Sequence, residues 1–136
     1  MKISSSFSSF VNSFSRVSIF VIYAWFGLLK ILQLSPAIEL VEQMHNMMLP
    51  FIPFNSFYPI LGLIEIIIGI MFLVPRATKL AVVALLLHMV VTMLPLILLP
   101  GVTWSGFLVP TLAGQYIIKN LAIIALALNI YKEDAA

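Results

Sequence analysis

The chain contains no cysteine among its 136 residues. This absence excludes disulfides, thiol catalysis and iron–sulfur clusters bound through cysteine. It also excludes the class of quinone-linked membrane enzymes that form disulfides, because those enzymes act through cysteine pairs. Redox chemistry carried out by this chain alone is therefore not expected.

Charged residues are scarce as well. Lys, Arg, Asp and Glu make up 9% of the chain, hydrophobic residues make up 62%, and the mean hydropathy is +1.16. Soluble domains average roughly 25% charged and roughly 45–50% apolar residues. The net charge of +2 is small, and no basic run typical of a nucleic-acid patch is present. The composition predicts an integral membrane protein that binds no nucleic acid.

Four apolar runs are long enough to cross a bilayer, at about residues 17–34, 57–75, 77–99 and 109–131. Each has roughly the 20 residues that a helix needs to span a hydrocarbon core about 30 Å thick. No small-residue cleavage pattern follows the first run, so we expect it to remain as a membrane helix. The sequence predicts one all-α domain over residues 1–136, a membrane-embedded four-helix bundle.

The distribution of basic residues predicts the orientation of the bundle. They precede the first run, separate the second from the third and follow the fourth, as Lys2, Arg16, Arg76, Lys79 and Lys132. The other two connections, residues 35–56 and 100–108, contain no Lys or Arg. Since positively charged flanks stay in the cytoplasm, we expect both termini to be cytoplasmic.

The segment before the first run carries apolar residues at helical spacing, from Phe7 to Val17, with serines opposite them. It fits either a short interfacial helix or a frayed tail. The second outer connection, with Pro100, Gly101 and Trp104, predicts a turn with an interfacial tryptophan.

The first outer connection has the pattern of a helix. Ser35-Pro36 is a typical helix start, because Ser can cap a helix and Pro suits its first turn. An apolar stripe from Ile38 to Leu49 follows, and Pro50 ends it. We predict a short amphipathic helix that lies over the outer end of the bundle.

Ionisable groups lie inside all four runs, as Lys30, Glu65, His88 and Lys119. A charged group at the centre of a membrane helix costs roughly 2.5–3.5 kcal/mol. Each lies on a helix face with small or polar neighbours, and such faces pack against other helices in lipid. On the fourth run this face also carries Gln115. We therefore expect all four faces to point inward and to form a polar pocket toward the outer side.

The expected ligand-binding residues of this pocket are Lys30, Glu65, His88, Gln115 and Lys119. Alternative roles stay open: Lys30 snorkels to the interface, Glu65 is only the counter-ion of a lysine, or His88 is a hydrogen-bonded packing residue. Two buried lysines against one glutamate leave one positive charge unmatched. An anionic ligand, a quinone, a lipid head group or a neutral lysine would each compensate for it.

The remaining chemistry is limited. Haem is not expected, because His45 lies in the outer connection while His88 is mid-helix. Glu65 and His88 alone are too few ligands for a metal site. No set of nucleophile, base and orienting residue is visible, so we predict no catalytic residue and no built-in cofactor. A quinone bound beside a catalytic partner protein remains compatible with these residues.

Short motifs in order along nearly the whole chain resemble the DoxX-like superfamily of four-helix membrane proteins. They are Trp25-Phe26-Gly27-Leu28-Leu29-Lys30, Leu61-Gly62-Leu63-Ile64-Glu65 with Gly69, Pro75-Arg76-Ala77-Thr78, and Gly114-Gln115-Tyr116-Ile117-Ile118-Lys119-Asn120. The resemblance extends especially to the short bacterial inner-membrane branch linked to resistance to reactive chlorine species. The resemblance implies a four-helix bundle in a bacterial cytoplasmic membrane.

The resemblance implies less about function. Some members look like small subunits of quinone-linked oxidoreductases, including a thiosulfate:quinone system. Others belong to stress responses, and eukaryotic relatives act as receptor-assembly chaperones. Three functions follow as hypotheses: a subunit that binds a quinone-like or small anionic ligand, an assembly or scaffold protein with purely structural buried charges, and a small transporter or channel, for which a homodimer would supply a path.

Overall fold

A computed structural model describes residues 4–136 of the chain; Lys2 lies outside the described residues. The elements are, in order, α1 (Ser5–Ile31), α2 (Ile38–Met48), α3 (Phe54–Phe72), the 3-10 helix η1 (Pro75–Ala77), α4 (Thr78–Met93), α5 (Pro95–Leu98), α6 (Pro100–Thr103), β1 (Trp104–Gly106), β2 (Val109–Pro110) and α7 (Leu112–Ala135). Four helical stretches are long and apolar enough to cross a membrane: Ser5–Ile31, Phe54–Phe72, Pro75–Leu98 and Leu112–Ala135. The predicted all-α, four-span architecture is confirmed.

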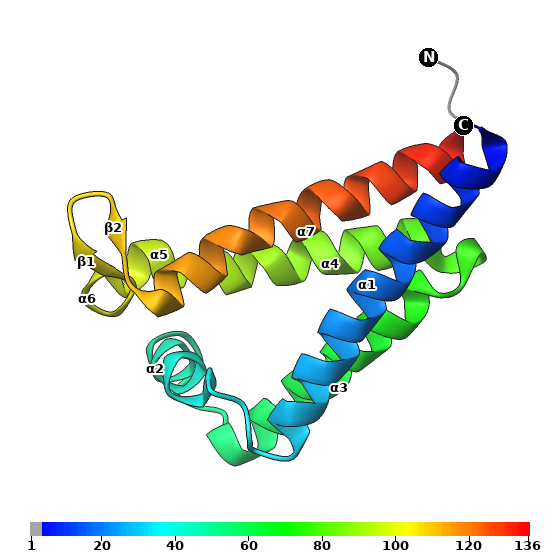
Figure 1. Cartoon of the computed structure of the whole chain (residues 1–136). Coiled ribbons are helices and arrows are strands. Elements are labelled where there is room, and N and C mark those ends of the chain that lie inside the picture. Colours follow the sequence, from blue (N-terminus) through cyan, green and yellow to red (C-terminus); the bar gives the residue numbers. More distant parts are fainter. Residues whose placement is uncertain (1–3) are drawn as a thin grey trace.

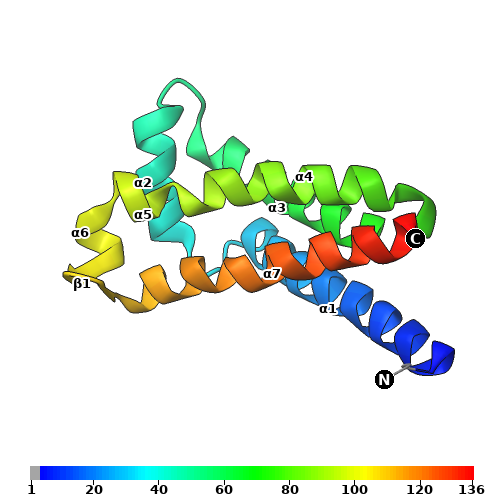
Figure 2. The ribbon, with the colours of Figure 1, turned by 90° about the horizontal axis from the view of Figure 1, so that it is seen from above.

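The long helices form two pairs that diverge. Helix α1 packs along α3, and α4 packs along α7. The pairs meet at the end where the described chain begins and ends, and they separate toward the end that carries α2, α5 and the β1–β2 hairpin (Figure 1). We call these the closed end and the open end. Seen from above, α7 and α4 run side by side, α1 crosses beneath α7, and α3 lies beneath α4 (Figure 2).

Glycines bring α1 and α3 into close contact. A methyl group on Gly27 would collide with the carbonyl oxygen of Gly62, and one on Gly62 would collide with the carbonyl oxygen of Gly27. Gly69 packs in the same way against Tyr23, whose Cβ would lie 3.1 Å from an added Cβ. Small residues allow this backbone approach in lipid, where helices associate by packing.

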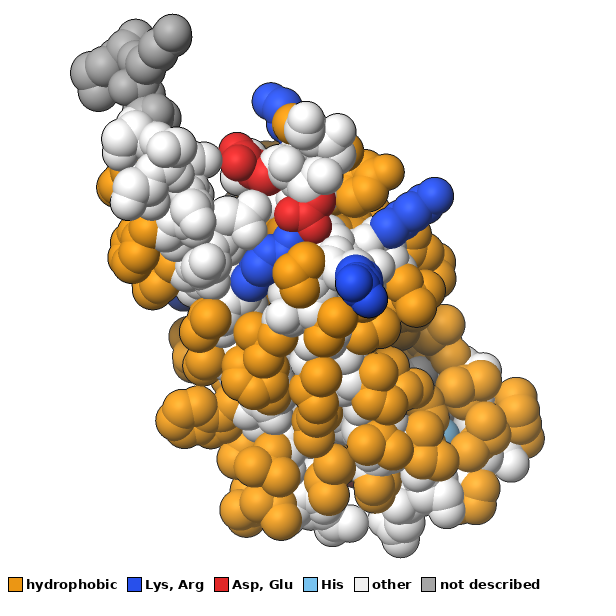
Figure 3. Space-filling view, turned by 90° about the vertical axis from the view of Figure 1, so that its right-hand side faces the viewer, with side chains coloured by type: hydrophobic (Ala, Val, Ile, Leu, Met, Phe, Trp, Pro, Cys, Tyr) orange, Lys and Arg blue, Asp and Glu red, His pale blue; other side chains and the backbone are white. Residues whose placement is uncertain are grey.

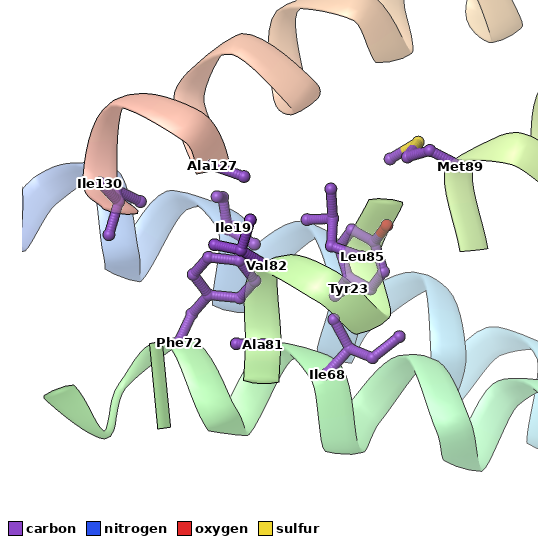
Figure 4. Close-up of a cluster of buried hydrophobic side chains, with 10 residues drawn as sticks. All are labelled: Ile19, Tyr23, Ile68, Phe72, Ala81, Val82, Leu85, Met89, Ala127 and Ile130. Atoms are coloured by element: carbon purple, nitrogen blue, oxygen red, sulfur yellow. The ribbon is translucent and has the colours of Figure 1, made fainter. Parts of the chain in front are cut away.

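The hydrophobic core joins all four long helices toward the closed end (Figure 4). Ile19 of α1, Phe72 of α3, Leu85 of α4 and Ile130 of α7 are almost completely buried there. Many other large apolar side chains are exposed, as expected for a surface in contact with lipid acyl chains. Charged side chains gather at the closed end, while most of the face below them is hydrophobic (Figure 3).

The first outer connection contains the predicted helix, and a proline interrupts the third span. The predicted amphipathic helix exists as α2, with Met44 buried, and the Ser35 hydroxyl accepts a hydrogen bond from the backbone of Ala37 at 3.2 Å. Pro95 interrupts the third span, since α4 ends at Met93 and α5 begins at Pro95.

Two expectations for the connections are wrong. The N-terminal segment is neither a separate interfacial helix nor a tail, because α1 runs unbroken from Ser5. The second outer connection is more than a turn, since it forms α6 and a two-stranded hairpin. The Trp104 indole donates a hydrogen bond to the Leu96 carbonyl at 2.9 Å, which ties this hairpin to α5.

Candidate functional site

Glu65, near the middle of α3, connects three of the long helices. Its Oε2 lies 2.8 Å from Nζ of Lys30 on α1, and its Oε1 lies 3.0 Å from Nε2 of His88 on α4. The exposed fractions are 5% for Glu65 and 7% for Lys30. The sequence-based expectation that these three residues lie together is therefore met in the structure.

Tyr23 of α1 extends this arrangement. Its hydroxyl lies 3.1 Å from Nδ1 of His88, and the two rings meet edge to face with centroids 5.4 Å apart. A carboxylate only accepts hydrogen bonds, so the neutral imidazole that faces Glu65 carries its proton on Nε2. Nδ1 is then the acceptor, and the Tyr23 hydroxyl donates to it. We call Tyr23, Lys30, Glu65 and His88 the Glu65 centre.

The helix faces explain why these side chains meet. Tyr23, Gly27 and Lys30 follow one another at helical spacing on α1, as do Gly62 and Glu65 on α3. Since both glycines lack a side chain, the two backbones come close enough for the lysine to reach the carboxylate. Both glycines are therefore part of the site's construction as well as of the helix packing.

The charges of the Glu65 centre balance. One ammonium, of Lys30, faces one carboxylate, of Glu65. The prediction of an unmatched buried positive charge is wrong, because it counted Lys119 among the buried groups. A buried ion pair of this kind gives little net stability, but removal of one partner leaves an expensive unpaired charge.

Lys119 and Gln115 do not reach the Glu65 centre. Both are exposed on α7, whose buried residues are Gly114, Ile117, Ala127 and Ile130. The ammonium of Lys119 lies 5.3 Å from the ring centroid of Tyr116. The prediction that these two residues are buried in the interior is wrong, because α7 diverges from α1 toward the open end (Figure 1).

Two features were missed from the sequence. The first is the hydroxyl–imidazole–carboxylate order of Tyr23, His88 and Glu65, which the sequence analysis did not recognise although Tyr23 shares a face with Lys30. Tyr23 and Glu65 are far apart in the chain, and His88 lies on a third helix. Only the tertiary contacts reveal that order.

The second missed feature is the buried Arg16 at the closed end. Its Nη1 donates to the Phe72 carbonyl and to the Thr78 hydroxyl, each at 3.0 Å, and its Nη2 pairs with Asp134. Its Nε donates to Asn12 at 2.8 Å. This Arg16 cluster (Asn12, Arg16, the Phe72 carbonyl, Thr78 and Asp134) joins all four long helices at their closed ends.

Two further polar atoms are buried near the open end. Nε2 of His45 and the hydroxyl of Tyr58 have no hydrogen-bond partner within the described part of the chain. The His45 ring lies between Phe54 and Phe57, with centroid distances of 5.4 Å and 4.8 Å. Helix α2 thus packs onto α3 through aromatic contacts.

Comparison with known proteins adds no relative: no family model, no curated protein and no solved structure matches this chain.

Proposed function

We propose that the chain is a small DoxX-like subunit of a bacterial cytoplasmic membrane, with both termini cytoplasmic, that binds a quinone-like ligand beside the Glu65 centre. The observation that carries this proposal is the chain of Tyr23, His88 and Glu65 in the middle of the membrane-spanning helices. The His88 side chain is 15% exposed, so a ligand can reach its edge.

The charge balance favours a neutral polar ligand over an anion at this place. Lys30 and Glu65 neutralise each other, so the centre presents hydrogen-bonding groups without net charge. A quinone offers carbonyl oxygens that accept hydrogen bonds, and it dissolves in the bilayer. Both ring nitrogens of His88 are already bonded, so the group that donates to such an oxygen is the Tyr23 hydroxyl, when it turns from Nδ1 of His88 to the ligand.

When bound, a quinone supplies an acceptor for two electrons and two protons. We assign electron delivery to a partner oxidoreductase and, for this chain, ligand binding and proton handling. Glu65 orients the imidazole of His88, and the Tyr23 hydroxyl is the donor nearest its other nitrogen. No residue of this chain is assigned a catalytic step.

A binding titration tests the proposal. The purified protein in lipid nanodiscs is titrated with a photoreactive short-chain quinone, and covalent labelling is measured by intact mass. His88→Phe removes both ring nitrogens, and we expect about tenfold weaker labelling, equivalent to the loss of one or two hydrogen bonds. Leu87→Phe introduces the same ring at an exposed neighbouring position and is the matched control. Equal affinity of a folded His88→Phe variant and the wild type would refute the proposal.

A scaffold role is the second candidate, and one observation favours it. Each member of the Glu65 centre already has a partner within the chain, so the contacts join α1, α3 and α4 without any ligand. In that role the Lys30→Glu and Glu65→Lys exchange restores the partner assembly that either single variant loses. A ligand site predicts instead that the exchange restores stability but not quinone labelling.

A further inference from the structure

Two helix faces that contact each other at the closed end continue toward the open end. On α1 the face runs through Ser15, Ile19, Ile22 and Phe26, and on α7 it runs through Ile130, Ala127, Ile123 and Lys119. At the closed end Ser15 and Ile130 line one surface hollow, and Ile19, Ala127 and Ile130 share the hydrophobic core. The spacing therefore places Phe26 and Lys119 on the sides of α1 and α7 that face each other.

The burial of these faces changes along their length. Ile19 and Ile130 are 0% and 1% exposed, whereas Ile22 and Ile123 are partly buried. Phe26 is 55% exposed, and Lys119 is exposed. Because both faces lose burial in the same direction, the two helices separate there, as the ribbon shows (Figure 1). Phe26 and Lys119 are therefore exposed side chains on the facing sides of α1 and α7, toward the open end.

Lys119 carries a charge that the described residues do not neutralise. Among residues 4–136 no carboxylate forms an ion pair with it, and Glu65 is already paired with Lys30. It lies seven residues beyond Leu112, the first residue of α7, which corresponds to about 10 Å of helix. A cation at this depth in a membrane protein favours a negatively charged partner. The Tyr116 ring stabilises the ammonium but does not neutralise it.

We propose that the exposed facing sides of α1 and α7 toward the open end bind an amphipathic oxyanion, a phosphate or carboxylate head on an acyl chain. The head pairs with Lys119, and Gln115, one turn closer to the open end, donates a hydrogen bond from its amide. The acyl chain packs on Phe26, Ile22 and Ile123. Since apolar side chains on these sides are exposed, such a molecule reaches them from the bilayer.

The facing sides of α1 and α7 fit a second copy of the chain less well. A two-fold axis that brought two α7 faces together would place Lys119 against Lys119, and like charges in contact oppose association. The chain's own carboxylates other than Glu65 lie on α2 or at the end of α7. The inference goes beyond the proposed quinone site and does not rest on it, because its charged residue, Lys119, is on α7 and none of its residues belongs to the Glu65 centre.

Native mass spectrometry from delipidated detergent solution tests the proposal with four probes. They are phosphatidylglycerol, phosphatidylcholine with the same chains, oleate, and inorganic phosphate. We expect the wild type to retain phosphatidylglycerol or oleate about tenfold more strongly than phosphatidylcholine, and phosphate alone not at all. The first two probes distinguish a phosphate head from a carboxylate head.

Single-residue variants test whether Lys119 and Phe26 bind the anionic amphiphile. Lys119→Gln is expected to abolish the preference for an anionic head, while Lys132→Gln, an exposed lysine at the closed end, keeps it. Phe26→Ala is expected to weaken both anionic amphiphiles. Tyr23→Phe is expected to leave them unchanged, which separates this site from the quinone proposal. An unchanged preference in Lys119→Gln would overturn the inference, as would equal retention of phosphatidylcholine. Retention of a partner polypeptide through Lys119 in place of any amphiphile would also overturn it.

Discussion

The Arg16 cluster and the Glu65 centre both join helices through a buried charged side chain, but they differ in their place along the helices. Every guanidinium nitrogen of Arg16 has a partner, and these partners come from Asn12, Phe72, Thr78 and Asp134. In the Glu65 centre the edge of His88 stays partly exposed. The first arrangement is suited to holding helix ends together, and the second leaves part of an imidazole ring accessible within the membrane-spanning helices.

The two regions also differ in their surroundings. The Arg16 cluster lies at the closed end, where the core is densest and the four long helices meet. The Glu65 centre lies closer to the open end, where the helix pairs begin to separate. Met89 lies there, apart from the other core side chains (Figure 4). A polar group in the first region stabilises the bundle against opening. A polar group in the second region can face a molecule between the pairs.

The largest expected effect comes from the Arg16 cluster. Arg16→Ala removes the four hydrogen bonds of the guanidinium and leaves the Phe72 carbonyl without this donor, so we expect a loss of about 3–5 kcal/mol in the free energy of unfolding. Arg76→Ala, at an exposed position in η1, is the control and should change it by less than about 0.5 kcal/mol. Unfolding in detergent with a graded denaturant measures both. Equal stability of the two variants would show that the Arg16 contacts do not hold the bundle.

The next effect comes from the ion pair of the Glu65 centre. Glu65→Met alone leaves the ammonium of Lys30 buried and unpaired, and we expect a loss of about 3 kcal/mol. The Lys30→Met and Glu65→Met double variant removes both charges and should regain most of that loss. Quinone labelling should stay lost in the double variant. Labelling that returned together with stability would assign the pair a purely structural role.

A smaller effect is expected from the glycine contact that brings Lys30 to Glu65. Gly62→Ala forces α3 away from the Gly27 carbonyl, which should cost about 1–3 kcal/mol. Gly101→Ala is the matched control, since an added Cβ there has no neighbour within 4 Å. Thermal unfolding of the two variants side by side gives the comparison. A Gly62→Ala protein as stable as Gly101→Ala would mean that the helices separate without cost.

Local features were predictable from the sequence because they are encoded within single segments. Hydropathy over about 20 residues identifies a membrane helix, and the start at Ser35 with the apolar stripe to Leu49 identifies α2. Helical spacing also placed Lys30, Glu65 and His88 on inward faces. Each of these predictions needs only the residues of one helix.

The rest depends on how helices are arranged relative to one another. Arg16 reads as an ordinary flanking charge, because its partner Asp134 is 118 residues away in the chain. Spacing assigns Lys119 to a face but does not give the angle between α1 and α7, so its exposure was not predictable. The hairpin over Trp104 to Pro110 depends on packing against α5 and α6 as well as on its short strands.

Two single-hydroxyl variants test the central contrast most directly. Tyr23→Phe removes one hydroxyl from the Glu65 centre, and Thr78→Val removes one from the Arg16 cluster. Quinone affinity and unfolding free energy are measured for both in the same nanodiscs. We predict that each variant loses about 1 kcal/mol of stability, but that only Tyr23→Phe binds quinone about fivefold more weakly, while Thr78→Val keeps its affinity. Loss of stability in both variants with no change of affinity in either would contradict the account.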